Sequence, residues 1–284
     1  MGSKSIKIFL VQEGDGGSSY RTKNEEGSNY RNHLIDSGET LVTQADIKHI
    51  AHGTLRQDGD LATLLVFEFR FISTSLKEKR RFKSASITLK FEDVGGDERL
   101  EPEVFRIAPE NSHYLNPTTR TRDISHSFGG GVFGGLDIAG AELGYEMEFH
   151  ETKLSNHATR LSGMKRVSGR SYGNPNTVIW SLRENTHMKD GIPSFLRTSI
   201  LLRRKHGAVF RAFITVETIV DFKTEVRRLT GREGTDPVDP FDIDPDLEYP
   251  EDLKTAKINL DSLEDLDLMS MGGVIVAKEM SPIE

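Results

Sequence analysis

The sequence predicts an all-β fold: an antiparallel sandwich or barrel of about nine or ten strands with an acidic C-terminal extension. Apolar residues recur at every second position far more often than at every third or fourth. This is the spacing of strands that bury one face. Continuous helical patterns are scarce, and a chain of 284 residues is long enough to bury one large core. We therefore expect one β body.

Two alternating segments near the start of the body illustrate the pattern. Residues 85–91 alternate Ala, Ile, Leu and Phe with Ser, Thr and Lys, and residues 64–71 are similarly apolar. The charged stretch 77–81 between them predicts a hairpin. Asp58-Gly59 suits the positive φ angles of a tight turn, so it predicts a second hairpin that joins residues 50–55 to the next strand. Further strands are expected at residues 141–150, 178–182, 200–205 and 209–222.

The clearest alternation runs from residue 141 to residue 150. Five apolar residues, Ala141, Leu143, Tyr145, Met147 and Phe149, alternate with Glu142, Gly144, Glu146, Glu148 and His150. Seven glycines between positions 129 and 144 predict bulges or close backbone approach. A flexible gate over a cavity and a hairpin that refolds into a membrane are the alternatives. The G-x-G-x-x-G match at 129–134 leads into a strand and not into a helix, so we expect no dinucleotide site.

Acidic residues concentrate at the C-terminal end. From Asp236 onward there are fourteen acidic residues and three lysines, a balance of −11, so the first 235 residues carry about +4 of the total of −7. We divide the chain into an all-β body, residues 1–235, and an acidic segment, residues 236–284, that packs on the body. Residues 259–268 carry leucines three apart. A helix laid on the sheet and a linear interaction motif are the two interpretations.

Composition excludes several classes of function. The chain has no cysteine, which rules out disulfides, thiolate zinc sites and cysteine nucleophiles. Its histidines follow no metal-ligand spacing, so we expect neither a metal nor a cofactor. The acidic net charge, without an aromatic-studded basic stripe, argues against nucleic acid as the partner. No apolar stretch suits a transmembrane helix or a secretory signal, so we expect a cytoplasmic protein.

The candidate site lies in residues 178–185, Val-Ile-Trp-Ser-Leu-Arg-Glu-Asn. Trp180 and Glu184 share a strand face, and an apolar, aromatic surrounding raises the pKa of a carboxyl group, as a proton donor near neutral pH requires. Glu184 and His187 are therefore the candidate catalytic residues; a structural carboxylate at the strand end is the alternative for Glu184. The candidate residues that bind substrate are Trp180, Tyr145, Met147, Phe149 and Asn185.

Residues 180–185, Trp-Ser-Leu-Arg-Glu-Asn, together with Gly191-Ile192-Pro193 and the acidic stretch 236–241, resemble a broad group of fungal proteins known mainly as uncharacterised. The resemblance covers residues 60–245. It implies a fungal cytoplasmic protein linked to secondary-metabolite biosynthesis, a setting in which cofactor-free β proteins include isomerases and cyclases. It brings no catalytic residues with it.

These patterns leave two functions open. The first is a cofactor-independent protein that binds a hydrophobic small molecule in a β pocket, as an isomerase or cyclase of a secondary-metabolite intermediate. The second is a non-enzymatic module that docks on a membrane or a protein through its basic loops, residues 77–83 and 203–205, with the acidic segment as an autoinhibitory cover. The sequence does not decide whether the protein is an enzyme, nor its oligomeric state.

Overall fold

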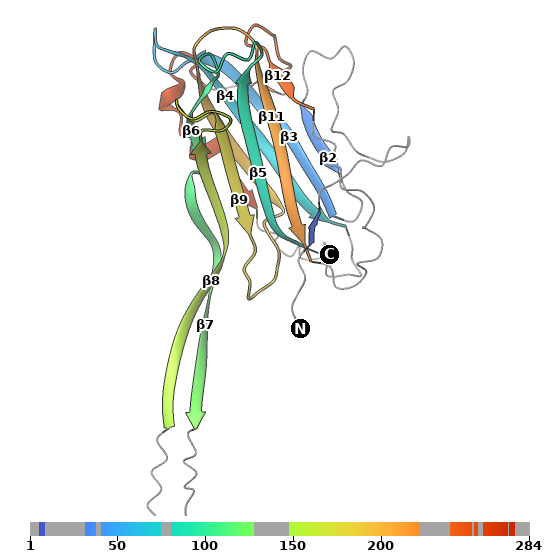
Figure 1. Ribbon diagram of the computed structural model, residues 1–284, viewed down its shortest axis with the longest axis vertical. Helices are drawn as coiled ribbons and strands as arrows, with labels where there is room; N and C mark the ends of the chain where they lie inside the picture. Colours follow the sequence, from blue (N-terminus) through green and yellow to red (C-terminus); the bar gives the residue numbers. More distant parts are fainter. Residues whose placement is uncertain are drawn as a thin grey trace, which may run out of the picture.

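The computed structural model consists of two β-sheets that pack face to face, with one long hairpin projecting beyond them (Figure 1). It describes residues 6–8, 32–37, 41–74, 81–127, 148–221, 239–251, 253–254, 258–271 and 273–275. The strands are β1 (Ile6–Ile8), β2 (His33–Ser37), β3 (Leu41–Thr54), β4 (Leu61–Ser73), β5 (Phe82–Asp93), β6 (Glu103–Ala108), β7 (Asn111–Ser127), β8 (Glu148–Arg166), β9 (Thr177–Arg183), β10 (Phe195–Arg204), β11 (Phe210–Val220), β12 (Phe241–Ile243) and β13 (Gly273–Ile275). A 3₁₀ turn, η1 (Leu263–Asp265), and a one-turn helix, α1 (Leu268–Met271), lie near the C-terminal end.

Every strand pairing in the described residues is antiparallel. The first sheet has the order β1-β11-β5-β9-β8-β7, and β12 also pairs with β11. The second sheet has the order β13-β10-β4-β3-β2, and β6 also pairs with β10. The predicted all-β sandwich is therefore confirmed. The strands exceed the predicted nine or ten because β1, β12 and β13 are each three residues long, too short to show alternation.

The core lies between the two sheets and follows the alternation of the sequence. In β5, Ala85, Ile87, Leu89 and Phe91 are buried, while the residues between them are half-buried. Strand β4 is buried on both faces for most of its length. Burying one large apolar side chain contributes roughly 1.5–3 kcal/mol, so these alternating rows are what holds the two sheets together.

The predicted hairpin between residues 64–71 and 85–91 is wrong. Strand β4 pairs with β3 and β10, whereas β5 pairs with β11 and β9, in the other sheet. Alternation reveals which face of a strand is buried but not which strand lies beside it. The predicted turn at Asp58-Gly59 is confirmed: it joins β3 to β4, and Asp58 has a φ of 57°.

Residues 258–271 of the acidic segment cover the outer face of the second sheet, whereas its β12, Tyr249 and Leu253 contribute to the first sheet and to the core between the sheets. Leu263 and Leu268 are fully buried against a cluster on that face that includes Leu64, Val66 and Leu201. Residues 259–268 form the turn η1 and an extended stretch before α1, in place of the predicted single helix. Leu263, Leu266 and Leu268 pack on the sheet, as the first interpretation expected, whereas Leu260 is 45% exposed.

Backbone contacts fix the course of this segment. Thr54 N–H donates to the carbonyl of Leu260 at 2.8 Å, and Glu264 N–H donates to the carbonyl of Leu55 at 3.0 Å. Arg56 makes two bonds to the carboxylate of Glu264, at 2.6 and 2.8 Å. The segment passes so close to β3 that a Cβ at Gly53 would lie 2.0 Å from the carbonyl oxygen of Leu260.

Strands β7 and β8 extend beyond the sandwich as a two-stranded ribbon (Figure 1). Strand β8 pairs with β9 only from Arg160 to Arg166. Residues 148–157 of β8 instead pair with residues 118–127 of β7, and no third strand among the described residues joins them. We call these two stretches the arm. A register shift between Leu115 and Thr118, which flank Pro117, marks its base. Proline lacks the N–H group that a ladder bond needs, and it is tolerated here because β7 is the edge strand of its sheet and the register shifts at this point.

Among the described residues, no helix has the length and apolar composition that a bilayer crossing requires.

Replacing Gly53 with Ala should reduce the free energy of unfolding by about 1–3 kcal/mol, because the added methyl group overlaps the carbonyl of Leu260. Gly207→Ala is the matched control, since a Cβ there has nothing within 4 Å. Urea denaturation of both variants measures the difference. Equal midpoints would show that the acidic segment does not lie against β3.

Candidate functional site

The structure buries Trp180 in the core. Its side chain is fully buried, and its Nε1–H donates to the carbonyl of Pro109 at 2.8 Å. The indole also covers Gly163 on β8, where a Cβ would lie 2.1 Å from that same carbonyl oxygen. Trp180 therefore joins β9 to the turn that precedes β7, at the root of the hairpin.

Glu184 lies on the same face of β9, as predicted, and is also buried. Its carboxylate accepts two bonds from Arg81, at 2.7 and 3.2 Å, and Arg81 also donates to Asp221. Bonding to Glu184 raises the pKa of Arg81 above its ordinary value. The three residues connect the start of β5 with the ends of β9 and β11. This arrangement matches the structural alternative for Glu184.

Asn185 shapes the loop after β9. Its side-chain oxygen accepts bonds from the backbone N–H groups of His187, at 3.0 Å, and Met188, at 3.3 Å. Asn185 is buried and His187 is exposed. The backbone carbonyl of Asn185 also accepts a hydrogen bond from Lys189 N–H at 2.9 Å. Asn185 thus holds the turn that presents the His187 side chain to solvent.

The other predicted binding residues are not brought to Trp180. Phe149 lies on the arm, opposite His126, whereas Gly163 lies opposite Trp180. These two positions of β8 are fourteen residues apart (163 − 149), roughly 45 Å along a strand. Tyr145 and Met147 lie outside the described residues. The proposed substrate-binding role of these residues stays a prediction.

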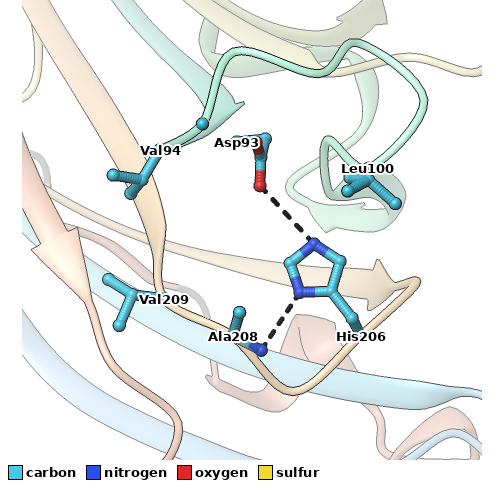
Figure 2. Close-up of a pocket in the computed structure, with 7 residues that line it drawn as sticks. Asp93, Val94, Leu100, His206, Ala208 and Val209 are labelled. Carbon is cyan, nitrogen blue, oxygen red and sulfur yellow. Dashed lines mark hydrogen bonds and ion pairs between the residues drawn. The ribbon is translucent and has the colours of Figure 1, made fainter.

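A hollow of about 520 Å³ is shown in close-up in Figure 2. The end of β5 and the turn between β10 and β11 form it, and none of the predicted site residues contributes. Its lining is mostly apolar. The lining residues are Asp93, Val94, Gly95, Leu100, His206, Ala208 and Val209.

Both ring nitrogens of His206 face protein groups in this hollow. Ala208 N–H donates to Nδ1 at 3.0 Å, so Nδ1 is an acceptor and the proton of the neutral ring resides on Nε2. Nε2 lies 3.5 Å from a carboxylate oxygen of Asp93. Figure 2 shows the ring held between these two groups. Nε2 itself has no hydrogen-bond partner among the described residues. Because the lining of the hollow is mostly apolar, the hollow suits an apolar group.

A buried polar cluster includes His52 and Arg204. His52 Nδ1 shares a hydrogen bond with the Thr63 hydroxyl at 2.9 Å, and its ring packs on Tyr249 at 5.7 Å between centroids. Burial, together with the charge of Arg204, lowers the pKa of His52 to about 4. Arg204 is only 6% exposed, and burial lowers its pKa too. No group of three or more histidines and carboxylates in the described part of the chain is arranged to hold a metal.

Comparisons with known proteins add little. No family model matches the sequence, and no curated protein is significantly similar to it. Among solved structures, Clostridium perfringens delta-toxin aligns with a TM-score of 0.31 and 11% identity, over 69% of this chain and 85% of the toxin. The Clostridium perfringens NetB toxin in its membrane-inserted form aligns with a TM-score of 0.24 and 10% identity, over 63% of this chain and 88% of that chain. Neither TM-score is high enough to establish a shared fold.

Glu184→Gln should reduce the free energy of unfolding by about 1–3 kcal/mol, because it removes one of the two carboxylates that pair with the half-buried Arg81. Glu248→Gln, whose side chain is 90% exposed, is the control and should leave stability nearly unchanged. Chemical denaturation at neutral pH makes the comparison. If both variants match the original protein, the ion pair does not support the fold.

His52 should make stability depend on pH. It stays neutral in the folded protein down to about pH 4 but takes up a proton near pH 6.5 when unfolded. Its contribution is fully present above pH 6.5 and should decrease by roughly 3 kcal/mol as the pH falls to 4. His52→Phe, which keeps the ring contact with Tyr249, should flatten this slope in denaturation curves measured across that range. Parallel slopes in both proteins would contradict the assignment.

Proposed function

We propose that this protein is a non-enzymatic β-module that docks on a membrane through the arm. The observation that carries the proposal is that residues 118–127 and 148–157 pair only with each other, clear of the sandwich. An isolated two-stranded hairpin is marginally stable in water. The arm is about 30 Å long at the usual rise per residue. A partner surface that covers the arm would stabilise it, as neighbouring strands stabilise the hairpins within the two sheets.

The sequence that leads into β8 favours a membrane as that surface. The apolar row from Ala141 to Phe149 occupies alternate positions and ends on the arm. Strands that cross the apolar part of a bilayer run for about 9–11 residues and alternate apolar with polar side chains. A paired hairpin also satisfies its backbone groups, as a bilayer requires. These features support the interpretation of this region as a hairpin that enters a membrane.

Three arginines of the predicted basic loops are engaged within the protein. Arg203 is paired with Glu103, Arg204 is buried, and Arg81 is bonded to Glu184. Residues 77–80 lie outside the described residues, so docking through the loops stays a prediction, and we place the proposed docking surface on the arm. Within the acidic segment, residues 258–271 lie on the second sheet, whereas β12 pairs with β11 in the first sheet. The autoinhibitory role of the segment stays a prediction.

The hydrophobic-ligand hypothesis has one supporting observation, the apolar hollow of Figure 2. Its predicted residues lie elsewhere, and His206 is held by Ala208 and Asp93. We therefore infer at most the binding of an apolar group there. An isomerase or cyclase reaction has no support from the hollow.

The test introduces two acidic residues into the apolar row. Leu143→Asp/Met147→Asp should abolish flotation with vesicles of phosphatidylcholine and phosphatidylserine, because charged side chains on the lipid-facing side of a strand are destabilising. The matched control, Gly144→Asp/Thr152→Asp, adds the same charge at positions of the opposite parity and should still float. Flotation of both variants, or of neither, would contradict docking through this row. An original protein that never floats would refute the proposed function itself.

A further inference from the structure

Residues 241–251 and Leu253 of the acidic segment connect the two sheets, and we call them the bridging segment. Its strand β12 pairs with β11 of the first sheet. On the second sheet, the backbone N–H of Ile50 in β3 donates to the carbonyl of Leu253 at 2.9 Å. Release of the segment would expose four of its side chains that belong to the core, namely Phe241, Ile243, Tyr249 and Leu253.

The side chain of His52 on β3 supports this segment. Its ring packs on the ring of Tyr249, with 5.7 Å between the centroids. Its Nδ1 shares a hydrogen bond of 2.9 Å with the hydroxyl of Thr63, the residue opposite it on β4. The hydroxyl of Tyr249 in turn accepts a hydrogen bond from the backbone N–H of Asp244 at 3.1 Å. His52 thus contacts the bridging segment where Tyr249 holds the turn after β12.

The second ring nitrogen of His52 is shielded from solvent and has no hydrogen-bond partner among the described residues. A protonated imidazole donates from both of its nitrogens. A proton on His52 would therefore leave a charged donor without an acceptor as long as Tyr249 covers the ring. Such a buried group destabilises the conformation that contains it.

A buried cation adds to this effect. Arg204 on β10 is only 6% exposed, and its two hydrogen bonds, to the carbonyls of His206 and Ala62, are long, at 3.3 and 3.4 Å. Burial and then the charge of Arg204 lower the pKa of His52, whereas Asp244 acts in the opposite direction. The surroundings of His52 therefore favour the neutral ring while the segment is bound.

We propose that His52 is an acid-sensitive switch that releases the bridging segment from β3 and from the core. The pKa of His52 is about 4 with the segment bound, and exposure of the ring would restore the ordinary value of 6.5. Protonation therefore favours release as the pH falls below 6.5, and the equilibrium constant for release should rise roughly 25-fold between about pH 7.5 and about pH 5.

His49, also on β3, is a second histidine at this contact. Burial, followed by the charges of Lys48 and Arg197, lowers its pKa, whereas Glu68 and a bond to the Leu253 backbone raise it. Because the net shift has the same direction as that of His52, His49 adds to the effect of acid. The inference does not depend on docking, since release requires no membrane.

Hydrogen–deuterium exchange of the full chain, read by mass spectrometry, tests the switch. Exchange is measured at about pH 7.5 and about pH 5 and is corrected for the intrinsic effect of pH on amide exchange. At the lower pH, the amides of the bridging segment and of Ile50 should exchange roughly 25-fold faster. The amides of residues 64–67 in β4, which has a paired strand on each side, should stay protected.

Two neutral replacements separate His52 from other acid effects. His52→Phe keeps a ring against Tyr249, and His52→Gln keeps a polar group beside Thr63, so a folding defect in one does not prevent the test. Each should remove most of the acceleration at the lower pH. His33→Phe is the matched control, because His33 on β2 has a side chain that is 58% exposed. This variant should respond to pH like the original protein.

Loss of the pH response in the His52 variants, with the response kept in the His33 variant, supports the switch. An original protein whose bridging segment exchanges no faster at the lower pH would overturn it. So would an equal acceleration in β4, which would indicate unfolding of the whole sandwich, or a full response in the His52 variants. Each of these results is obtained without vesicles, so it leaves the docking proposal to its own test.

Discussion

The indole of Trp180 fixes where the sandwich ends and the arm begins. It lies in a row with Ile87 on β5 and Gly163 on β8, and it reaches across the glycine to the carbonyl of Pro109. Any side chain at position 163 would block that bond. Because the bond is buried, breaking it leaves a donor and an acceptor without partners, which costs more than a surface bond would contribute. The arm can project from the body because this contact holds its base in the core.

Charge in the sandwich is used to join strands. Arg81 connects Glu184 and Asp221 at three strand ends, and Glu68 is shared by Arg70 and Arg197 on the second sheet. The carboxylates of Glu184 and Glu68 are buried, and a buried charge without a partner of opposite charge destabilises the fold. Paired charges therefore hold the body together.

The features of the core that could be predicted are those that depend on the sequence of a single strand or turn. The alternation of residues 85–91 gave the buried face of β5, and Asp58-Gly59 gave the turn between β3 and β4. The partner of each strand was not predictable, which is why β4 and β5 were wrongly joined. The shared face of Trp180 and Glu184 was predicted as well. Arg81, which pairs with Glu184, lies 103 residues away, and no local pattern points to it.

By itself the sequence determined the all-β class, the apolar rows and the acidic segment, because alternation and composition are properties of each stretch of chain. Only the tertiary structure decided that the leucines of the acidic segment cover the second sheet and that Glu184 neutralises Arg81. It also decided that β7 and β8 pair with each other beyond the sandwich. The physical reason is that a strand has a fixed two-residue period, whereas its register against a neighbour is set by hydrogen bonding and packing between distant segments.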